Sequence, residues 1–273
     1  MTENSYTEQI LKQRADREKR LLANPHNWFS LIGLFPLMDG TNSIGGTGDN
    51  SIAIPGLPQE QFASLILEKG SVFLRGAVDS VMVNNKPAEL RRLQTDHDAE
   101  TDVLSIGSIH IIVIRRGERF FLRAWDVQSP AARNFSGLNY FPINPEYRIH
   151  AKFVSFPEPK IIPVEDVIGT NYEVKYIGKA IFTIEGIPCS LIAELDEEDL
   201  LFSFTDQTKS DDTYPGGRLF TTCLPENDMV ILDFNLARNW PCAYTPHATC
   251  PLPPFENHLP VRIEAGEKRY FTS

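Results

Sequence analysis

Cysteine is scarce in this sequence, with 4 cysteines among 273 residues and no CxxC pair. Small disulfide-stapled scaffolds carry many more cysteines, and zinc knuckles need closely paired ones. We therefore expect the cysteines to be reduced and to pack as small hydrophobic side chains. They are Cys189, Cys223, Cys242 and Cys250.

Long apolar runs and an excess of basic charge are also missing. No segment, the polar N-terminus included, approaches the roughly 20 apolar residues that a membrane span needs. The formal net charge is −10, so a polyanion is repelled on average. These features predict a cytoplasmic protein that binds neither a membrane nor nucleic acid, and they leave its oligomeric state open.

Familiar catalytic motifs are absent as well. The chain has no GxSxG elbow, no P-loop and no GxGxxG followed by a helix. The signatures of α/β-hydrolases and of nucleotide-binding folds are therefore excluded. No cofactor is predicted, and whether the protein is an enzyme stays open.

The first pattern that the chain does contain is helical. Residues 5–22 lack Pro and Gly and are rich in Glu, Lys, Gln and Arg, which predicts a helix with a narrow apolar stripe. Pro25 disfavours helical geometry in the residue before it, so an N-terminal helical segment is assigned to residues 1–27. The apolar side chains among its charges are Tyr6, Ile10, Leu21 and Leu22.

The rest of the chain predicts a mainly β protein. Short alternating runs between Gly and Asn turn clusters indicate a β-sandwich over residues 28–126. Residues 127–146 combine prolines with aromatic side chains, which favours an ordered connection over a flexible linker. Residues 147–273 contain at least seven alternating runs, ending with LPVRIEAGE. We predict an antiparallel β-barrel or closed sandwich there, because closure removes exposed strand edges.

The front half has a recognisable layout. NSIGGTGDNSIAIPG, a strand pair, VMVNNKPAEL and SIGSIHIIVI follow one another as in a forkhead-associated domain, which this half therefore resembles. That resemblance implies turns that frame a phosphopeptide site. However, Gly46 stands where that family has its phosphate-binding arginine, and PQEQFASL lacks the serine and histidine of its recognition loop. Without those charge-assisted donors, we interpret the layout as one kept for packing.

Three longer strings carry a more specific resemblance. They are GLNYFPINPEYRIHAKF, FTDQTKSDDTYPGGRLF and DFNLARNWPCAYTPHATCPLPPFENHLPVRIEAGEK. Over residues 5–271 the chain resembles the prokaryotic family catalogued as domain of unknown function 1684, a resemblance that implies no particular activity. The family pattern has AYNPPCAY where this chain has ARNWPCAY, so Arg238 and Trp240 are departures from it.

Polar side chains at the ends of two apolar strands form the candidate site. Asp206 follows LLFSFT and Asp233 ends MVILD, and a carboxylate at such a place is half-buried unless it faces a cleft. With the nearby guanidinium, amide and phenol groups, these carboxylates predict a site for a small polar or anionic molecule in the C-terminal barrel. The ligand-binding candidates are Arg218, Asp233, Asn235, Asn239, Tyr244 and Asp206.

Several alternatives stay open beside this ligand-binding module. One is a hydrolytic enzyme that uses Asp206 or Asp233 as its base, and another is a protein-interaction scaffold. In a purely structural interpretation, Arg218 pairs with one of the aspartates. The segment from Cys242 to Cys250 also contains His247, but its spacing does not match a zinc site, so no metal is predicted.

Overall fold

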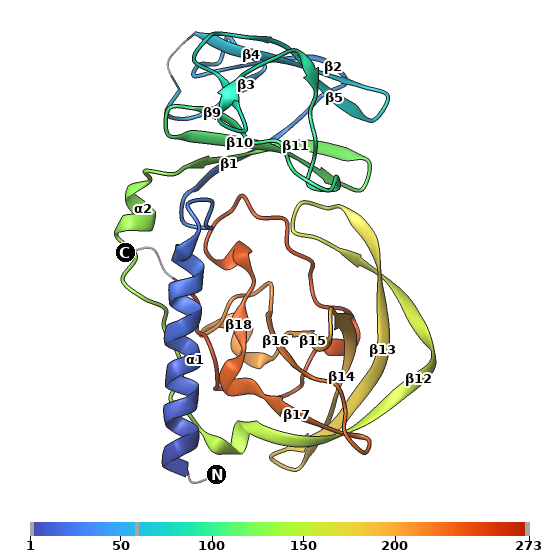
Figure 1. The fold of residues 1–273 in the computed structure, drawn as a ribbon. Helices are drawn as coiled ribbons and strands as arrows, with labels where there is room; N and C mark the ends of the chain where they lie inside the picture. The colour runs from blue at the N-terminus through green and yellow to red at the C-terminus, as the bar shows by residue number, and fades with distance from the viewer. Residues whose placement is uncertain (1–2, 58–59, 271–273) are drawn as a thin grey trace. The chain divides into compact units, whose positions relative to one another are not determined.

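The structure is a computed structural model that describes residues 3–57 and 60–270 (Figure 1). Its described residues form one long helix, three sheets and short helical turns, which confirms the mainly β class with an N-terminal helix. The chain divides into two compact units. Residues 22–135 form the first unit, and the residues up to 21 together with those from 136 onward form the second unit.

Helix α1 runs from Glu3 to Ala23, as predicted. Tyr6, Ile10 and Arg14 are buried and recur every fourth residue, so they share one face of the helix. Leu22 is 36% exposed, so the apolar stripe is shorter than expected and continues with an arginine. Among the described residues, no helix is long and apolar enough to cross a membrane.

The first unit contains two sheets, with strand orders β1-β11-β10-β9-β6-β7 and β3-β2-β4-β5-β8. One hydrophobic core unites their buried side chains, including Leu65, Leu104 and Leu122. The forkhead-associated-like strand layout stays a prediction. The elements are β1 Leu31–Pro36, β2 Gly40–Gly45, β3 Ile52–Ala53, β4 Gln61–Glu68, β5 Ser71–Ala77, β6 Met82–Val83, β7 Lys86–Pro87, β8 Arg91–Arg92, β9 Leu104–Ile106, β10 Ile109–Arg116, β11 Arg119–Asp126 and α2 Pro130–Arg133.

Two histidines contact each other in the first unit. Nε2 of His26 lies 2.7 Å from Nδ1 of His110, and the ring of His26 also packs on Trp125. A hydrogen bond between two imidazoles needs one donor and one acceptor nitrogen, so at least one ring must be neutral. Burial lowers the pKa of both histidines, and the neighbouring His110 lowers the pKa of His26 further.

We expect the first unit to lose stability as the pH falls below about 6.5, the pKa of histidine in an unfolded chain. In that window the unfolded chain binds more protons than the folded chain, so the free energy of unfolding decreases as the pH falls. Calorimetric melting temperatures measured across the window test this expectation. The decrease should be smaller in His110→Gln and unchanged in His97→Gln, whose ring is exposed. Equal pH dependence in the wild type and His110→Gln would contradict it.

The second unit is built on a seven-stranded antiparallel sheet in the order β17-β12-β13-β14-β15-β16-β18 (Figure 1). Phenylalanine rings at 202, 204, 220 and 234 pack together in its core. The register of β12 shifts between Ser155 and Lys160, where two prolines interrupt the ladder. The strands are β12 Arg148–Glu165, β13 Asn171–Ile184, β14 Ile187–Asp196, β15 Asp199–Phe204, β16 Arg218–Cys223, β17 Met229–Asp233 and β18 Arg238–Asn239.

Short helical turns connect these strands. Each is a single turn of 3-10 helix, and several begin at a residue whose side chain accepts a hydrogen bond from the turn. The turns are η1 Pro145–Tyr147, η2 Gln207–Ser210, η3 Phe234–Leu236, η4 Pro241–Ala243 and η5 Phe255–Asn257.

The predicted barrel over residues 147–273 is wrong, because no sheet among the described residues closes on itself. The ladder ends at β17 on one side and at β18 on the other. The run at residues 259–267 buries alternate side chains as a strand would, but it joins no sheet. Three of its carbonyl groups accept hydrogen bonds from one guanidinium, where a neighbouring strand would otherwise supply N–H donors. Arg218 donates to the carbonyls of Ile263, Ala265 and Glu267.

The expectation of four reduced cysteines is wrong for one pair. Cys242 and Cys250 form a disulfide, with their Cα atoms 6.2 Å apart. The loop between them returns on itself, and the N–H of each residue donates to Sγ of the other at 3.2 Å. Cys189 and Cys223 are free thiols. Disulfides are typical of oxidising compartments, so the cytoplasmic location stays a prediction.

Candidate functional site

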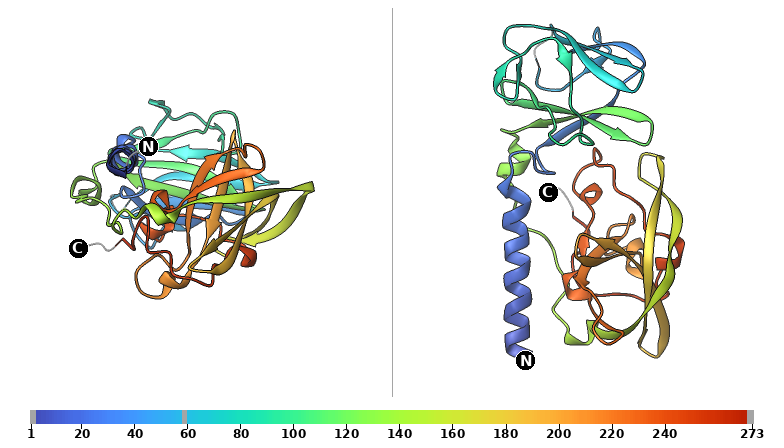
Figure 2. Two further views of the ribbon diagram at one scale, coloured as in Figure 1. Left: turned by 90° about the horizontal axis from the view of Figure 1, so that it is seen from below. Right: turned by 45° about the vertical axis from the view of Figure 1, so that its right-hand side comes forward.

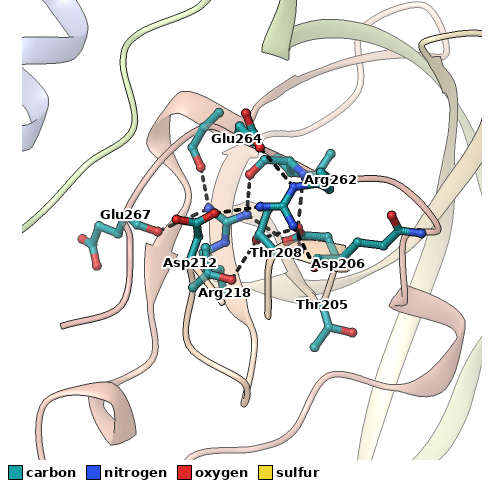
Figure 3. Close-up of polar contacts among 12 residues, drawn as sticks. Thr205, Asp206, Thr208, Asp212, Arg218, Arg262, Glu264 and Glu267 are labelled. Carbon is teal, nitrogen blue, oxygen red and sulfur yellow. Dashed lines mark hydrogen bonds and ion pairs between the residues drawn. The ribbon is translucent and has the colours of Figure 1, made fainter. Parts of the chain in front are cut away.

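Asp206 and Arg218 form one buried ion pair (Figure 3). Nη2 of Arg218 lies 2.8 Å from Oδ2 of Asp206, and both side chains are at most 2% exposed. Asp206 also accepts hydrogen bonds from the Thr208 hydroxyl at 2.6 Å and from the N–H of Ile263 at 3.2 Å. The pair therefore holds η2 and the C-terminal segment against β16. The polar atoms of both side chains face protein groups in the interior.

Asp233 and Asn235 lie at the turn after β17 and contact the first turns of α1. The Tyr6 hydroxyl donates to Asp233 at 2.9 Å, and Nδ2 of Asn235 donates to the Tyr6 oxygen at 3.0 Å. The same amide donates to the carbonyl of Asn144 at 2.8 Å. Burial raises the pKa of Asp233, although hydrogen bonds from Tyr6 and Asn235 oppose the shift. This set of contacts ties the helix to η3.

Glu267 is a fully buried carboxylate at the centre of a second cluster. It accepts hydrogen bonds from the Tyr244 hydroxyl at 2.6 Å and from the N–H of Asn239 at 2.8 Å, and it pairs with Nε of Arg17. Burial alone lowers the pKa of Arg17, but Glu267 and Tyr244 outweigh it and raise that pKa. Burial and then Glu267 raise the pKa of Tyr244. At neutral pH Arg17 is therefore a guanidinium and Tyr244 a neutral phenol.

A cavity of about 510 Å³ lies beside Glu267, between α1 and the chain around β18. Arg14, Arg17 and Arg20 follow one another at three-residue spacing along the helix, so they point to one side of it. Figures 1 and 2 show this helix beside the C-terminal part of the chain. Arg238 reaches the same cavity from β18. We call this cavity, with its four arginines, the arginine pocket.

The charge of the arginine pocket is opposite in sign to that of the chain. It has four arginines and two carboxylates in its lining, whereas the chain carries a formal net charge of −10. Both carboxylates already have cationic partners, since Glu267 pairs with Arg17 and Asp16 pairs with Lys12. Arg14, Arg20 and Arg238 form no ion pair with either carboxylate among the described residues, so the lining of the cavity is net positive.

Two of these arginines are partly withdrawn from water. Arg14 donates to the carbonyls of Phe141 at 3.1 Å and Asn235 at 3.2 Å, and burial lowers its pKa. The guanidinium of Arg238 makes neither a hydrogen bond nor an ion pair with any residue that the structure describes. Burial and then the nearby charge of Arg17 lower the pKa of Arg238, although the carboxylates of Glu267 and Asp196 partly oppose the shift. A guanidinium in this position is costly unless an anion joins it.

Residues 133–268 match the family described as "Protein of unknown function (DUF1684)". Over these residues, the chain belongs to that family. The match confirms the resemblance over residues 133–268, and its extension to residues 5–132 stays a prediction. The DUF1684 chain is also similar to the solution NMR structure of an uncharacterized protein from Haloarcula marismortui, at 30% identity and a TM-score of 0.43, covering 51% of this chain and 80% of that one. No curated protein matches the sequence.

Of the six predicted site residues of the DUF1684 region, one lines the arginine pocket and two bind a residue that lines it. Asn235 lines it. Asn239 and Tyr244 both bind Glu267, whose side chain also lines it. These residues therefore shape the wall of the cavity, and their polar atoms are engaged mainly with neighbouring protein groups.

The other three predicted residues lie behind that wall. Asp233 contacts the N–H of Asn235 at 3.1 Å and does not line the pocket. Arg218 does not line the pocket but donates a hydrogen bond to the backbone carbonyl of Glu267, at 3.3 Å. Asp206 does not line it either and is connected to it through its ion pair with Arg218. Their arrangement fits the structural alternative, in which Arg218 pairs with one aspartate.

Residues of α1 were missing from the predicted site, although they supply most of the positive charge of the pocket. The signal that points to them is the helical spacing of Tyr6, Ile10 and Arg14, which places a basic residue on the buried face. Arg17 follows on the same side of the helix. A charged residue that continues an apolar stripe needs a buried partner or a ligand.

The zinc alternative for the loop of this DUF1684 chain does not fit the structure. Cys242 and Cys250 bond to each other and are therefore unavailable as thiolate ligands beside His247. In the part of the chain that the structure describes, no group of three or more His, Cys, Asp or Glu side chains is placed to hold a metal ion.

Proposed function

We propose that the second unit binds a small anion in the arginine pocket. The observation that carries the proposal is Arg238, a largely buried guanidinium that has no acceptor among the described residues. Burying a charged group costs roughly several kcal/mol of free energy unless an ionic partner and hydrogen bonds compensate it. An anionic ligand between Arg238 and the arginines of α1 supplies that compensation.

The donors around the cavity suit an oxyanion. Guanidinium groups bind carboxylates and phosphates through paired N–H donors. Nε of Arg14 and the hydroxyl of Tyr140 are also buried without a hydrogen-bond partner in the described chain, which leaves two further polar atoms at this cavity. A volume of about 510 Å³ is within the range of small-molecule sites. The ligand class is therefore a small molecule that bears a carboxylate or a phosphate.

The same geometry favours binding over the hydrolytic alternative. Asp206 is held in the ion pair with Arg218, and Asp233 accepts hydrogen bonds from Tyr6 and Asn235. Neither aspartate lines the arginine pocket. A general base must reach the proton that it removes, so these carboxylates give the enzyme hypothesis no support at this cavity.

Replacing Arg238 with alanine is expected to weaken oxyanion binding by about tenfold or more, because a hydrogen bond to a charged group contributes roughly 1.5–3 kcal/mol. Thermal-shift and calorimetric titrations with inorganic phosphate and citrate measure the change. In anion-free buffer, Arg238→Ala should be as stable as the wild type or more stable, because it removes an unpaired buried charge.

Arg269→Ala is the matched control for this experiment. Arg269 is also partly buried in the second unit, but it does not line the arginine pocket. The control should bind phosphate and citrate as the wild type does. If neither anion stabilises the wild type, or if both variants lose affinity equally, the proposal is wrong.

A further inference from the structure

A second cavity, of about 330 Å³, lies in the second unit and shares no lining residue with the arginine pocket. Its floor comes from one face of β12 to β15, where Tyr176 and Glu194 are cross-strand partners. Trp240, Pro251 and Leu252 cover it from the two segments that flank the disulfide-closed loop. We call this cavity the aromatic pocket.

The walls of the aromatic pocket are largely apolar. Tyr172, Tyr176 and Trp240 contribute aromatic rings. Valine, leucine and proline side chains provide much of the remaining surface. Rings of this kind attract cations to their faces as well as apolar groups, and indole does so most strongly. The walls therefore suit the apolar body of a ligand that also carries positive charge.

The polar groups of the aromatic pocket point to the same ligand. Its charged residues are Glu194 and Asp196, and no basic side chain lines it. The carboxylate of Glu194 has neither a hydrogen bond nor an ion pair with the described residues, although the residue is half-buried. Nε1 of Trp240 is likewise buried without an acceptor in the described chain. The Glu194 carboxylate thus remains to accept hydrogen bonds from a cationic group, whereas the Trp240 N–H would need an acceptor elsewhere on the ligand or from water.

We propose that the aromatic pocket binds an organic cation, whose apolar body packs on Tyr176 and Trp240 and whose protonated amine pairs with Glu194. The opposite charge of the arginine pocket makes the two sites selective for different molecules. Burial, with a smaller contribution from Asp196, raises the pKa of Glu194 to about 7. A bound ammonium group stabilises the carboxylate form, so the affinity for the amine should rise as the pH increases through 7.

Phenethylamine is a suitable probe, with 2-phenylethanol and 3-phenylpropionate as neutral and anionic analogues. We expect phenethylamine to shift the indole N–H resonance of Trp240 in the full chain and to bind more tightly than either analogue. Glu194→Gln should weaken phenethylamine binding by about tenfold or more, which corresponds to ~1.4 kcal/mol. It should leave 2-phenylethanol binding nearly unchanged and abolish the pH dependence.

Two matched variants separate this proposal from the arginine pocket. Glu173→Gln removes the same charge from an exposed position that does not line the aromatic pocket, and it should bind phenethylamine as the wild type does. Arg20→Ala, at a residue that lines the arginine pocket and not the aromatic pocket, should also leave phenethylamine binding unchanged, whatever happens to phosphate binding. The proposal is overturned if phenethylamine fails to shift the Trp240 resonance at millimolar concentration. It is also overturned if phenethylamine binds no better than 2-phenylethanol, or if Glu194→Gln or a lower pH leaves its affinity unchanged.

Discussion

Replacing Asp206 with alanine is expected to lower the free energy of unfolding of the second unit by about 3–5 kcal/mol, the typical cost of removing one partner of a buried ion pair. Arg218 is 1% exposed, so its charge remains in the interior without a counterion. The substitution also removes the acceptor for the Thr208 hydroxyl and for the N–H of Ile263. Loss of the pair therefore loosens the contact that fixes the C-terminal segment.

Differential scanning calorimetry and urea denaturation of the full chain measure this effect. Asp211→Ala is the matched control, because Asp211 pairs with Arg262 at 3.1 Å but is largely exposed. Exposed ion pairs contribute little to stability, so the control should unfold nearly as the wild type does. Similar unfolding of Asp206→Ala and Asp211→Ala would show that the buried pair does not hold the segment.

Local patterns were sufficient to predict the helix and the β class of this chain. The stretch that became α1 contains no Pro or Gly, and its C-terminal end follows from Asn24 and Pro25. Alternation also marked most strands, because each has one face on a core. These features depend on neighbours in the sequence, so the sequence reveals them directly.

Whether the sheet of the second unit closes into a barrel could not be predicted from local sequence patterns. Residues 259–267 alternate like a strand, and alternation reports only which side chains are buried. It does not tell which donors meet the backbone carbonyls. In this structure Arg218, more than 40 positions earlier, supplies those donors, so the segment joins the core without joining a ladder.

The candidate site was predicted in part for a related reason. Asn235, Asn239 and Tyr244 lie within one polar stretch that stood out in the sequence, and they do border the arginine pocket or bind Glu267. The arginines of α1 are more than 200 residues away in the chain from Arg238. Only the packing of the helix against the second unit brings these charges together, and no local motif encodes that contact.

The Glu267 carboxylate joins stability to the proposed function, and its replacement has two expected effects of opposite sign. Glu267→Gln should lower the free energy of unfolding by about 2–3 kcal/mol, because a charged acceptor is lost in the interior. The glutamine amide has one acceptor oxygen for donors that come from Arg17, Tyr244 and the N–H of Asn239. At the same time the arginine pocket loses one negative charge and Arg17 loses its partner, so phosphate should bind several-fold more tightly.

Unfolding by urea and titration with inorganic phosphate measure the two effects on the same protein. Glu264→Gln is the control, since this side chain is 53% exposed and pairs with Arg262 outside the pocket. It should change neither quantity appreciably. A destabilised Glu267→Gln with unchanged phosphate affinity would keep Glu267 as a structural anchor but separate it from the proposed anion site. If Glu267→Gln unfolds like the wild type, the charged carboxylate is not needed for stability. Other groups or water would then accept the hydrogen bonds of Arg17, Tyr244 and Asn239.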